Sequence, residues 1–245
     1  MSILHMTAEV LTTGLGVLPT GPGDPTWGDN PAITEKFLPA VGETLLMTFW
    51  PTFFTVVLGV PLGLFLVQTG PGGLTPRRGL NQVVSAVVNV LRSFPFIILI
   101  IALGPVMQVV VGSKLGWRAA SLALVISAVP FFARLVESNI ASLDHGKIEA
   151  AQMMGASNRQ IRWGVQVRET LPQIVRATTV LAITVIGYNA MAGAVGGGGL
   201  GQMAINYGYN RFQNDVMVVT IIGIIVIVML IQLIGDMISR LVDHR

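Results

Sequence analysis

The chain has no cysteine, and only 11% of its 245 residues are charged. Without cysteine it can form neither a disulfide framework nor a thiolate metal site. Its histidines, His5, His145 and His244, lie far apart and show no paired-ligand spacing, so no metal site is expected. Ordinary soluble domains carry about 25% charged residues, so the shortage of charge is the most informative absence.

The missing charge leaves long apolar runs in the sequence. No charged residue occurs from Thr44 to Pro76 or from Val216 to Gly235. A run of about 18 or more apolar residues is long enough to cross a bilayer as a helix. The sequence therefore predicts an all-α, multi-pass membrane protein. Five spans are expected, at residues 44–68, 83–111, 119–134, 177–195 and 216–238, with Pro95 and Pro105 inside the second.

The positive charges lie between the apolar runs and form no basic stripe, so a net charge of +3 does not indicate nucleic-acid binding. Lysine and arginine are enriched in cytoplasmic loops, and their counts predict an external N-terminus and a cytoplasmic C-terminus. The loops expected inside hold Arg77, Arg78, Lys147, Arg159, Arg162, Arg168, Arg176, Arg240 and Arg245. The loops expected outside hold Lys36, Lys114, Arg118 and Arg211.

Two arginines at the edges of the spans carry further expectations. A central arginine is costly in a bilayer, so the buried part of the second span is expected to start near Phe94, with Arg92 at the cytoplasmic rim. Arg134 and Glu137 are three residues apart and are expected to pair at the inner end of the third span.

The loop between the third and fourth spans is polar but is patterned as helix. Residues 149–154 are good helix formers, and Gly155 follows as a C-terminal glycine would. Ser157 and Gln160 have the spacing of a capping box, which predicts the start of a second helix. Pro172 is expected to break or kink the chain before it re-enters the membrane.

This loop resembles the EAA motif of type I ABC importer permeases, with Glu149, Ala150, Ala151 and Gly155 at the motif positions. The resemblance implies a short cytoplasmic helix that docks in a groove of a separate ATPase subunit. Met153 and Met154 would add adaptable apolar contact. The family usually has Leu-Pro about a dozen residues beyond the glycine, where this chain has Val167-Arg168. The alternative is an ordinary amphipathic loop helix packed under the bundle.

A second resemblance runs from about residue 42 to the end of the chain. It is carried by the segments Gly42-Glu-Thr-Leu, Arg92-Ser-Phe-Pro-Phe-Ile-Ile, Gly187-Tyr-Asn-Ala-Met-Ala-Gly-Ala-Val-Gly, Gly199-Leu-Gly-Gln and Tyr207-Gly-Tyr. Together they are similar to the methionine importer permease family. The likeness implies a homodimer of five-span subunits in a bacterial cell membrane, with two cytoplasmic ATPase subunits and an external substrate-binding lipoprotein. Its substrate would be D- or L-methionine, moved by alternating access. Residues 1–41 lie outside the likeness and are expected to form an external extension of the transmembrane domain at 42–245.

Nothing in the sequence predicts catalysis or nucleotide binding by this chain. Residues 196–201 formally contain G-x-G-x-x-G, but they follow a span and lack a strand–turn–helix context. No G-x-x-x-x-G-K-[ST] segment is present, so ATP and Mg²⁺ would be bound by the partner ATPase, and no cofactor is expected here.

Tyr188, Asn189 and Met191 are candidate pathway residues near the end of the fourth span. Polar residues inside a span usually face the bundle interior. We expect Met191 from two subunits to help close the pathway; packing and hydrogen bonding between helices is the alternative. Other solutes, a stand-alone secondary transporter and a membrane scaffold also stay open as functions, although a secondary transporter usually carries ionisable residues within its spans.

Overall fold

The structure is a computed structural model that describes residues 30–242, and every regular element in that range is helical. This confirms the all-α prediction. The α-helices are α2 (Pro31–Thr69), α3 (Arg78–Ser93), α4 (Phe96–Ala102), α5 (Gly104–Val111), α6 (Trp117–Ala141), α7 (His145–Met153), α8 (Asn158–Gln160), α9 (Arg168–Ala194), α10 (Gly199–Met203) and α11 (Asn214–Val242). Two π-helical segments, η1 (Ile161–Val167) and η2 (Ala204–Tyr209), continue α8 and α10.

Within residues 30–242, four helical stretches are long and apolar enough to cross a membrane: α2, α6, α11, and the 52-residue stretch Asn158–Tyr209, which contains α9 and is interrupted by a turn at residues 195–198. A fifth crossing is possible only if α3 and α4 form one span, and these two helices are bent by 102° to each other. The second span, expected at residues 83–111 with Pro95 and Pro105 inside it, is therefore divided into shorter helices. Phe94 has an extended ψ of 128°, because a residue that precedes proline is disfavoured in the helical region.

The same bend sets the position of Arg92. Helix α3 begins at Arg78, so Arg92 lies in its last turn, about 21 Å along the helix from the first residue. Arg92 therefore stands at the bend, just before the apolar helix α4 begins at Phe96, and its location at the cytoplasmic rim stays a prediction.

Helix α2 begins well before the first expected span. Asn30 caps it, because its side-chain oxygen accepts a hydrogen bond from Ala32 N at 2.9 Å, and Pro31 occupies the first turn. The boundary expected after residue 41 consequently falls inside α2. The buried Asn30 also donates to Asp215 Oδ2 at 2.7 Å, which joins the starts of α2 and α11. Residues 1–29 lie outside the described part of the chain.

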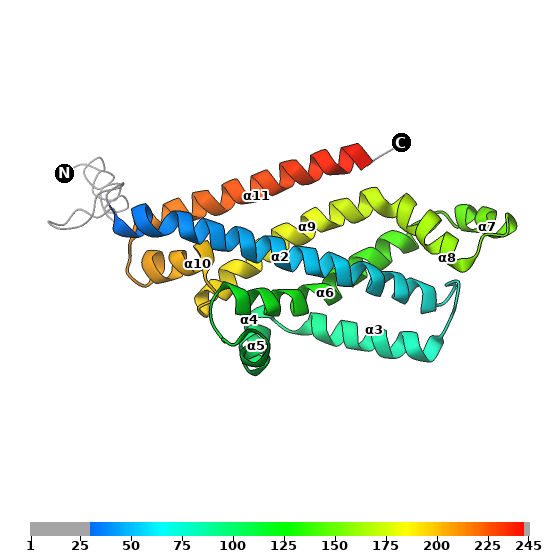
Figure 1. Cartoon of the computed structure of the whole chain (residues 1–245), viewed down its shortest axis with the longest axis horizontal. Coiled ribbons are helices and arrows are strands. Elements are labelled where there is room, and N and C mark those ends of the chain that lie inside the picture. The colour runs from blue at the N-terminus through cyan, green and yellow to red at the C-terminus, as the bar shows by residue number, and fades with distance from the viewer. Residues whose placement is uncertain (1–29, 243–245) are drawn as a thin grey trace, which may run out of the picture.

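The core lies where α2, α6 and α9 run along one another (Figure 1). On α2, Gly59 and Gly63 lie directly against α6. A Cβ atom at Gly63 would come within 2.6 Å of the Ala133 carbonyl oxygen, and one at Gly59 within 2.8 Å of Phe132 Cδ1. Small residues four apart let two helix backbones approach closely, which is how helices pack in membranes.

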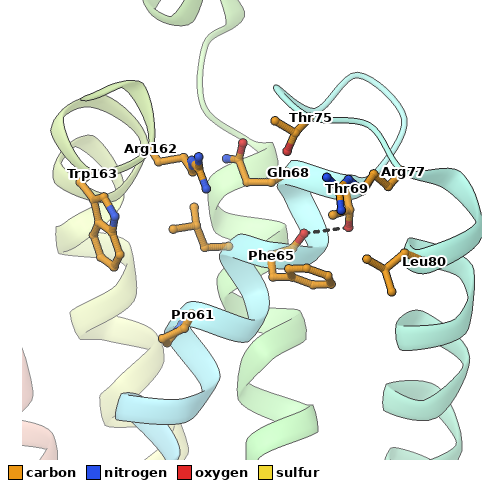
Figure 2. Close-up of a pocket in the computed structure, with 10 residues that line it drawn as sticks. Pro61, Phe65, Gln68, Thr69, Thr75, Arg77, Leu80, Arg162 and Trp163 are labelled. Atoms are coloured by element: carbon orange, nitrogen blue, oxygen red, sulfur yellow. Dashed lines mark hydrogen bonds between the residues drawn. The ribbon is translucent and has the colours of Figure 1, made fainter. Parts of the chain in front are cut away.

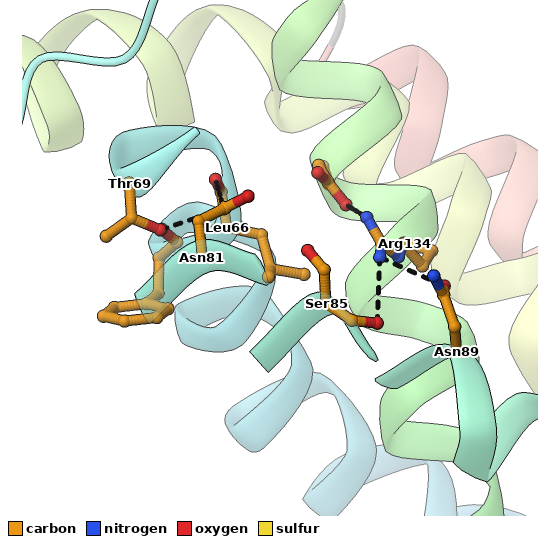
Figure 3. A network of polar contacts seen from close by, with 8 residues as sticks. Leu66, Thr69, Asn81, Ser85, Asn89 and Arg134 are labelled. Atoms are coloured by element: carbon orange, nitrogen blue, oxygen red, sulfur yellow. Dashed lines mark hydrogen bonds and ion pairs between the residues drawn. The ribbon is translucent and has the colours of Figure 1, made fainter. Parts of the chain in front are cut away.

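A polar network joins α3 to α6 (Figure 3). Arg134 Nη1 donates to Glu137 Oε2 at 2.6 Å, which confirms the expected pair. Its Nη2 donates to Asn89 Oδ1 at 3.0 Å and to the Ser85 carbonyl at 3.3 Å. This arginine therefore ties the polar side of α3 to the bundle.

Large apolar side chains remain exposed along α11, among them Ile222, Ile225, Met229, Leu233 and Met237. Only 11% of its most hydrophobic window is buried inside the chain. An exposed apolar face of this length marks a surface that meets lipid or another protein.

Candidate coupling loop and pathway residues

The EAA-like segment forms a helix with both ends closed by local hydrogen bonds. At the start of α7, the Asp144 side chain accepts from Gly146 N at 2.9 Å. At its end, Gly155 N donates to the Gln152 carbonyl at 2.9 Å, and Ala156 N donates to the Ala151 carbonyl at 3.0 Å. This pair of bonds is a Schellman motif, which requires a left-handed residue after the helix. Gly155 supplies it with φ +78°, as the predicted glycine corner requires.

The second helix starts as the sequence predicts. Ser157 N donates to Gln160 Oε1 at 2.8 Å, and Gln160 N donates back to Ser157 Oγ at 3.4 Å. This reciprocal arrangement is a capping box. Only a few residues separate the glycine corner from this cap, so α7 and α8 are held in a defined relation.

Pro172 does not break the helix, so of the two outcomes expected there, a break or a kink, the break is wrong. Segment η1 runs directly into α9, and Pro172 lies inside α9. Proline removes one backbone donor, but neighbouring turns can readjust to the loss, and the wider π-helical turn of η1 precedes it. Val167 and Arg168, which replace the Leu-Pro usual in the family, allow the helix to continue without interruption.

Helix α7 has one face packed on the chain and another left open. Ala151 is buried, and the ion pair between Lys147 and Glu169 joins α7 to α9. Glu149 and Ala150 are exposed, and the side chains of Met153 and Met154 are 90% and 81% exposed. These methionines are therefore accessible to a partner surface, as a docking helix requires, and docking itself stays a prediction.

Figure 1 shows α7 and α8 at one end of the molecule and α10 at the other. The loop that joins α2 to α3, with Arg77 and Arg78, lies at the same end as α7 (Figure 1). Two cationic loops therefore lie at the same end of the molecule: the loop between the first and second spans, and the loop between the third and fourth spans.

The candidate pathway residues on α9 face different neighbours. The Tyr188 ring stacks on Phe96 of α4, with centroids 4.8 Å apart and an interplanar angle of 10°. Asn189 is buried and donates from Nδ2 to Thr48 Oγ1 of α2 at 3.0 Å. Both contacts fit the packing alternative, so these two side chains serve the interior of the bundle.

Met191 is different, because its side chain is 47% exposed. Val180 and Gly187 are also exposed, and their spacing places them with Met191 along one face of α9. Within residues 30–242 this face lacks a covering helix, so it is available to a substrate or a second subunit. Val180 was not among the predicted pathway residues, although its helical spacing from Gly187 and Met191 places it on the same face.

Two of the motif segments meet at the opposite end of the molecule from α7. Glu43 Oε2 accepts from Gly199 N at 2.7 Å, and Thr44 Oγ1 accepts from Leu200 N at 2.9 Å. A Cβ atom at Gly201 would lie 2.6 Å from Ala190 Cα, so α10 packs tightly on α9. The glycine-rich segment is therefore used for close helix packing. Among the described residues, no cluster of histidine and acidic side chains could hold a metal ion.

Comparison with known proteins decides the family. The family model described as binding-protein-dependent transport system inner membrane component matches residues 56–245. The chain belongs to this family. It is a multi-pass inner-membrane component of a transport system rather than an enzyme, and the resemblance to ABC importer permeases is confirmed.

The chain is similar along most of its length to proteins named for methionine transport. It is 44% identical over 211 residues to the probable D-methionine transport system permease protein MetI of Vibrio cholerae, covering 83% of this chain and 94% of the relative. It is 44% identical over 220 residues to the methionine import system permease protein MetP of Bacillus subtilis, covering 86% and 99%. A chain from the inward-facing MetNI methionine ABC transporter matches with a TM-score of 0.84 at 42% identity, over 86% of this chain and 98% of that chain.

Proposed function

We propose that this chain is the membrane subunit of an ATP-driven methionine importer that works by alternating access. The observation that carries the proposal is 44% identity over nearly the whole of relatives named for methionine import. The exposed methionines of α7 support a mechanism in which another protein supplies the energy. D-methionine, L-methionine or both are the proposed substrates.

In this proposal, α7 is the coupling helix. Glu149 accepts hydrogen bonds from the ATPase, since charge-assisted bonds are strong and directional. Ala150 lets the partner surface approach closely, while Met153 and Met154 fill its apolar groove. Two ATPase subunits bind ATP and Mg²⁺ and act on two copies of this chain. The Lys147–Glu169 ion pair and buried Ala151 transmit the movement of α7 to η1 and α9.

The proposed orientation has α7 in the cytoplasm, because cationic loops are retained inside. The start of α2 and helix α10 then lie on the outer side, where an external binding lipoprotein delivers substrate. Residues 1–41 begin outside, and the chain ends inside.

Association of the chain with its ATPase tests the coupling assignment. Glu149→Arg should abolish co-purification in detergent, because it places a cation where the partner offers donors. Glu35→Arg makes the same charge change at an exposed residue of α2, at the opposite end of the molecule from α7, and should leave the complex intact. If Glu149→Arg retained both assembly and ATP-dependent uptake, or if the chain alone transported methionine without ATP, the proposal would be wrong.

The gate assignment rests on the open face of α9. Met191→Ala should raise substrate leak or uncoupled ATPase activity in proteoliposomes, because it removes an exposed side chain from the proposed closure. Met229→Ala, an exposed methionine on α11, is the matched control. Equal leak from the two variants would count against a gate at Met191. Competition of uptake by D- and L-methionine identifies the preferred isomer.

A further inference from the structure

A pocket of about 450 Å³ lies between the end of α2, the start of α3 and segment η1. The walls of this pocket are polar at one end and apolar at the other. Figure 2 shows Arg77, Arg162, Gln68 and Thr69 toward one end and Pro61 toward the other. The pocket is distinct from the exposed face of α7 and from the α9 face that carries Met191.

The polar end offers two arginines without acidic partners. Neither Arg77 nor Arg162 forms an ion pair with any residue in the range 30–242. Arg162 donates only through Nε, to the Asn158 carbonyl at 3.1 Å, which leaves its terminal nitrogens available. Planar guanidinium groups suit phosphate oxygens, so this end of the pocket fits a phosphate.

Gln68 closes the polar end of the pocket against segment η1. Its side chain is only 3% exposed, and its Nε2 donates to Gln166 Oε1 at 2.5 Å. Its Oε1 is buried without a hydrogen-bond partner among the described residues. Because this oxygen is closed to solvent, the charged groups that a ligand can reach at this end are the two arginines.

The other part of the pocket is apolar. Phe65, Leu80 and Trp163 line it, and all three are exposed outside the core of the chain. Tryptophan is favoured where a membrane meets water, because its ring spans apolar and polar surroundings. Segment η1 carries Trp163 next to Arg162, so this segment contributes to both the apolar and the polar end of the pocket.

We propose that this pocket binds an anionic phospholipid, with phosphatidylglycerol as the probe. Its phosphate lies between Arg77 and Arg162. The first part of the acyl chains lies along Phe65 and Trp163. A basic pocket between membrane helices is a known form of lipid headgroup site. The proposed orientation assigns this lipid to the cytoplasmic leaflet; binding itself does not depend on that assignment.

Native mass spectrometry of the purified full chain in detergent tests the proposal. The chain is titrated with phosphatidylglycerol, with phosphatidylcholine, and with phosphatidylglycerol in the presence of millimolar inorganic phosphate. Phosphatidylglycerol should bind more tightly than phosphatidylcholine, and inorganic phosphate should displace it poorly because it lacks the acyl chains. Arg77→Gln with Arg162→Gln should weaken binding about thirtyfold, since each arginine near a membrane surface contributes about fivefold.

The control is Arg159→Gln with Arg240→Gln, which removes the same charge from exposed positions outside the pocket and should bind as the unmodified chain does. Arg77→Lys with Arg162→Lys keeps the charge and should retain most of the binding, which guards against a loss caused by misfolding. Equal binding of the two lipids, equal loss in the control pair, or full displacement by inorganic phosphate would overturn the proposal. Because neither ATPase nor methionine is present, the result is independent of the proposed transport function.

Discussion

Replacing Gly155 with alanine should loosen the end of α7 through the backbone alone. Gly155 has φ +78°, and a Cβ atom built there meets nothing within 4 Å. No clash therefore contributes, and the cost is the strain of a left-handed alanine, about 1–2 kcal/mol. The Schellman bonds from Gly155 N and Ala156 N depend on this conformation. The equilibrium constant for opening these two hydrogen bonds should rise about fivefold to thirtyfold.

Gly164→Ala is a matched control for this change. Gly164 lies in η1, is also exposed, and a Cβ atom there likewise meets nothing within 4 Å, but its φ is not positive. Alanine in a helix interior is favoured over glycine by about 0.5–1 kcal/mol. The same substitution should therefore have opposite effects at the two positions.

Hydrogen–deuterium exchange of the purified chain measures the difference. Amides of residues 153–157 should exchange faster in Gly155→Ala, and those around η1 should exchange no faster in Gly164→Ala. Equal exchange at the end of α7 in both variants would refute the argument that the left-handed glycine holds the corner. If α7 is the coupling helix, Gly155→Ala should also lower the ratio of uptake to ATP hydrolysis while Gly164→Ala preserves it.

Three further substitutions test the packing. Gly63→Leu should lower the melting temperature and destabilise the fold by about 1–3 kcal/mol or more, because its Cβ atom would lie 2.6 Å from the Ala133 carbonyl oxygen. Gly42→Ala is the control and should leave the melting temperature unchanged, because a Cβ atom there meets nothing within 4 Å. Thr48→Val should lower the stability by about 0.6 kcal/mol, because it removes the oxygen that accepts the hydrogen bond from Asn189. A double-mutant cycle with Asn189→Leu that shows no coupling energy would contradict this bond. Arg134→Met should speed amide exchange across α3 but not α2, since it removes the bonds to Ser85 and Asn89; a uniform change would argue against a local tie.

Sequence reasoning worked best where the signal is local. The glycine corner at Gly155, the Ser157–Gln160 cap and the Arg134–Glu137 pair each depend on residues a few positions apart, and the structure contains all three. The bend at Phe94 differs from the predicted span at residues 83–111, which contains Pro95. The effect of this proline on the preceding residue, which ends α3, was the available clue.

The pathway candidates show the limit of reasoning from adjacent residues. Tyr188, Asn189 and Met191 are close in sequence, but successive residues of a helix point in different directions. One stacks on α4, one bonds to α2, and one remains exposed. Which of the three side chains is packed and which is exposed depends on where the neighbouring helices lie, and the sequence does not give those positions.

The sequence by itself determined the class of this protein. Long charge-free runs require helices that satisfy their own backbone hydrogen bonds in lipid. Tertiary structure decided what distant residues do together. The pocket between Gln68, Arg77 and Arg162 joins three separate segments. The bonds from Gly199 and Leu200 to Glu43 and Thr44 join residues 156 positions apart. Local patterns arise from forces between neighbours along the chain, whereas such sites arise only when packing brings remote helices within contact distance.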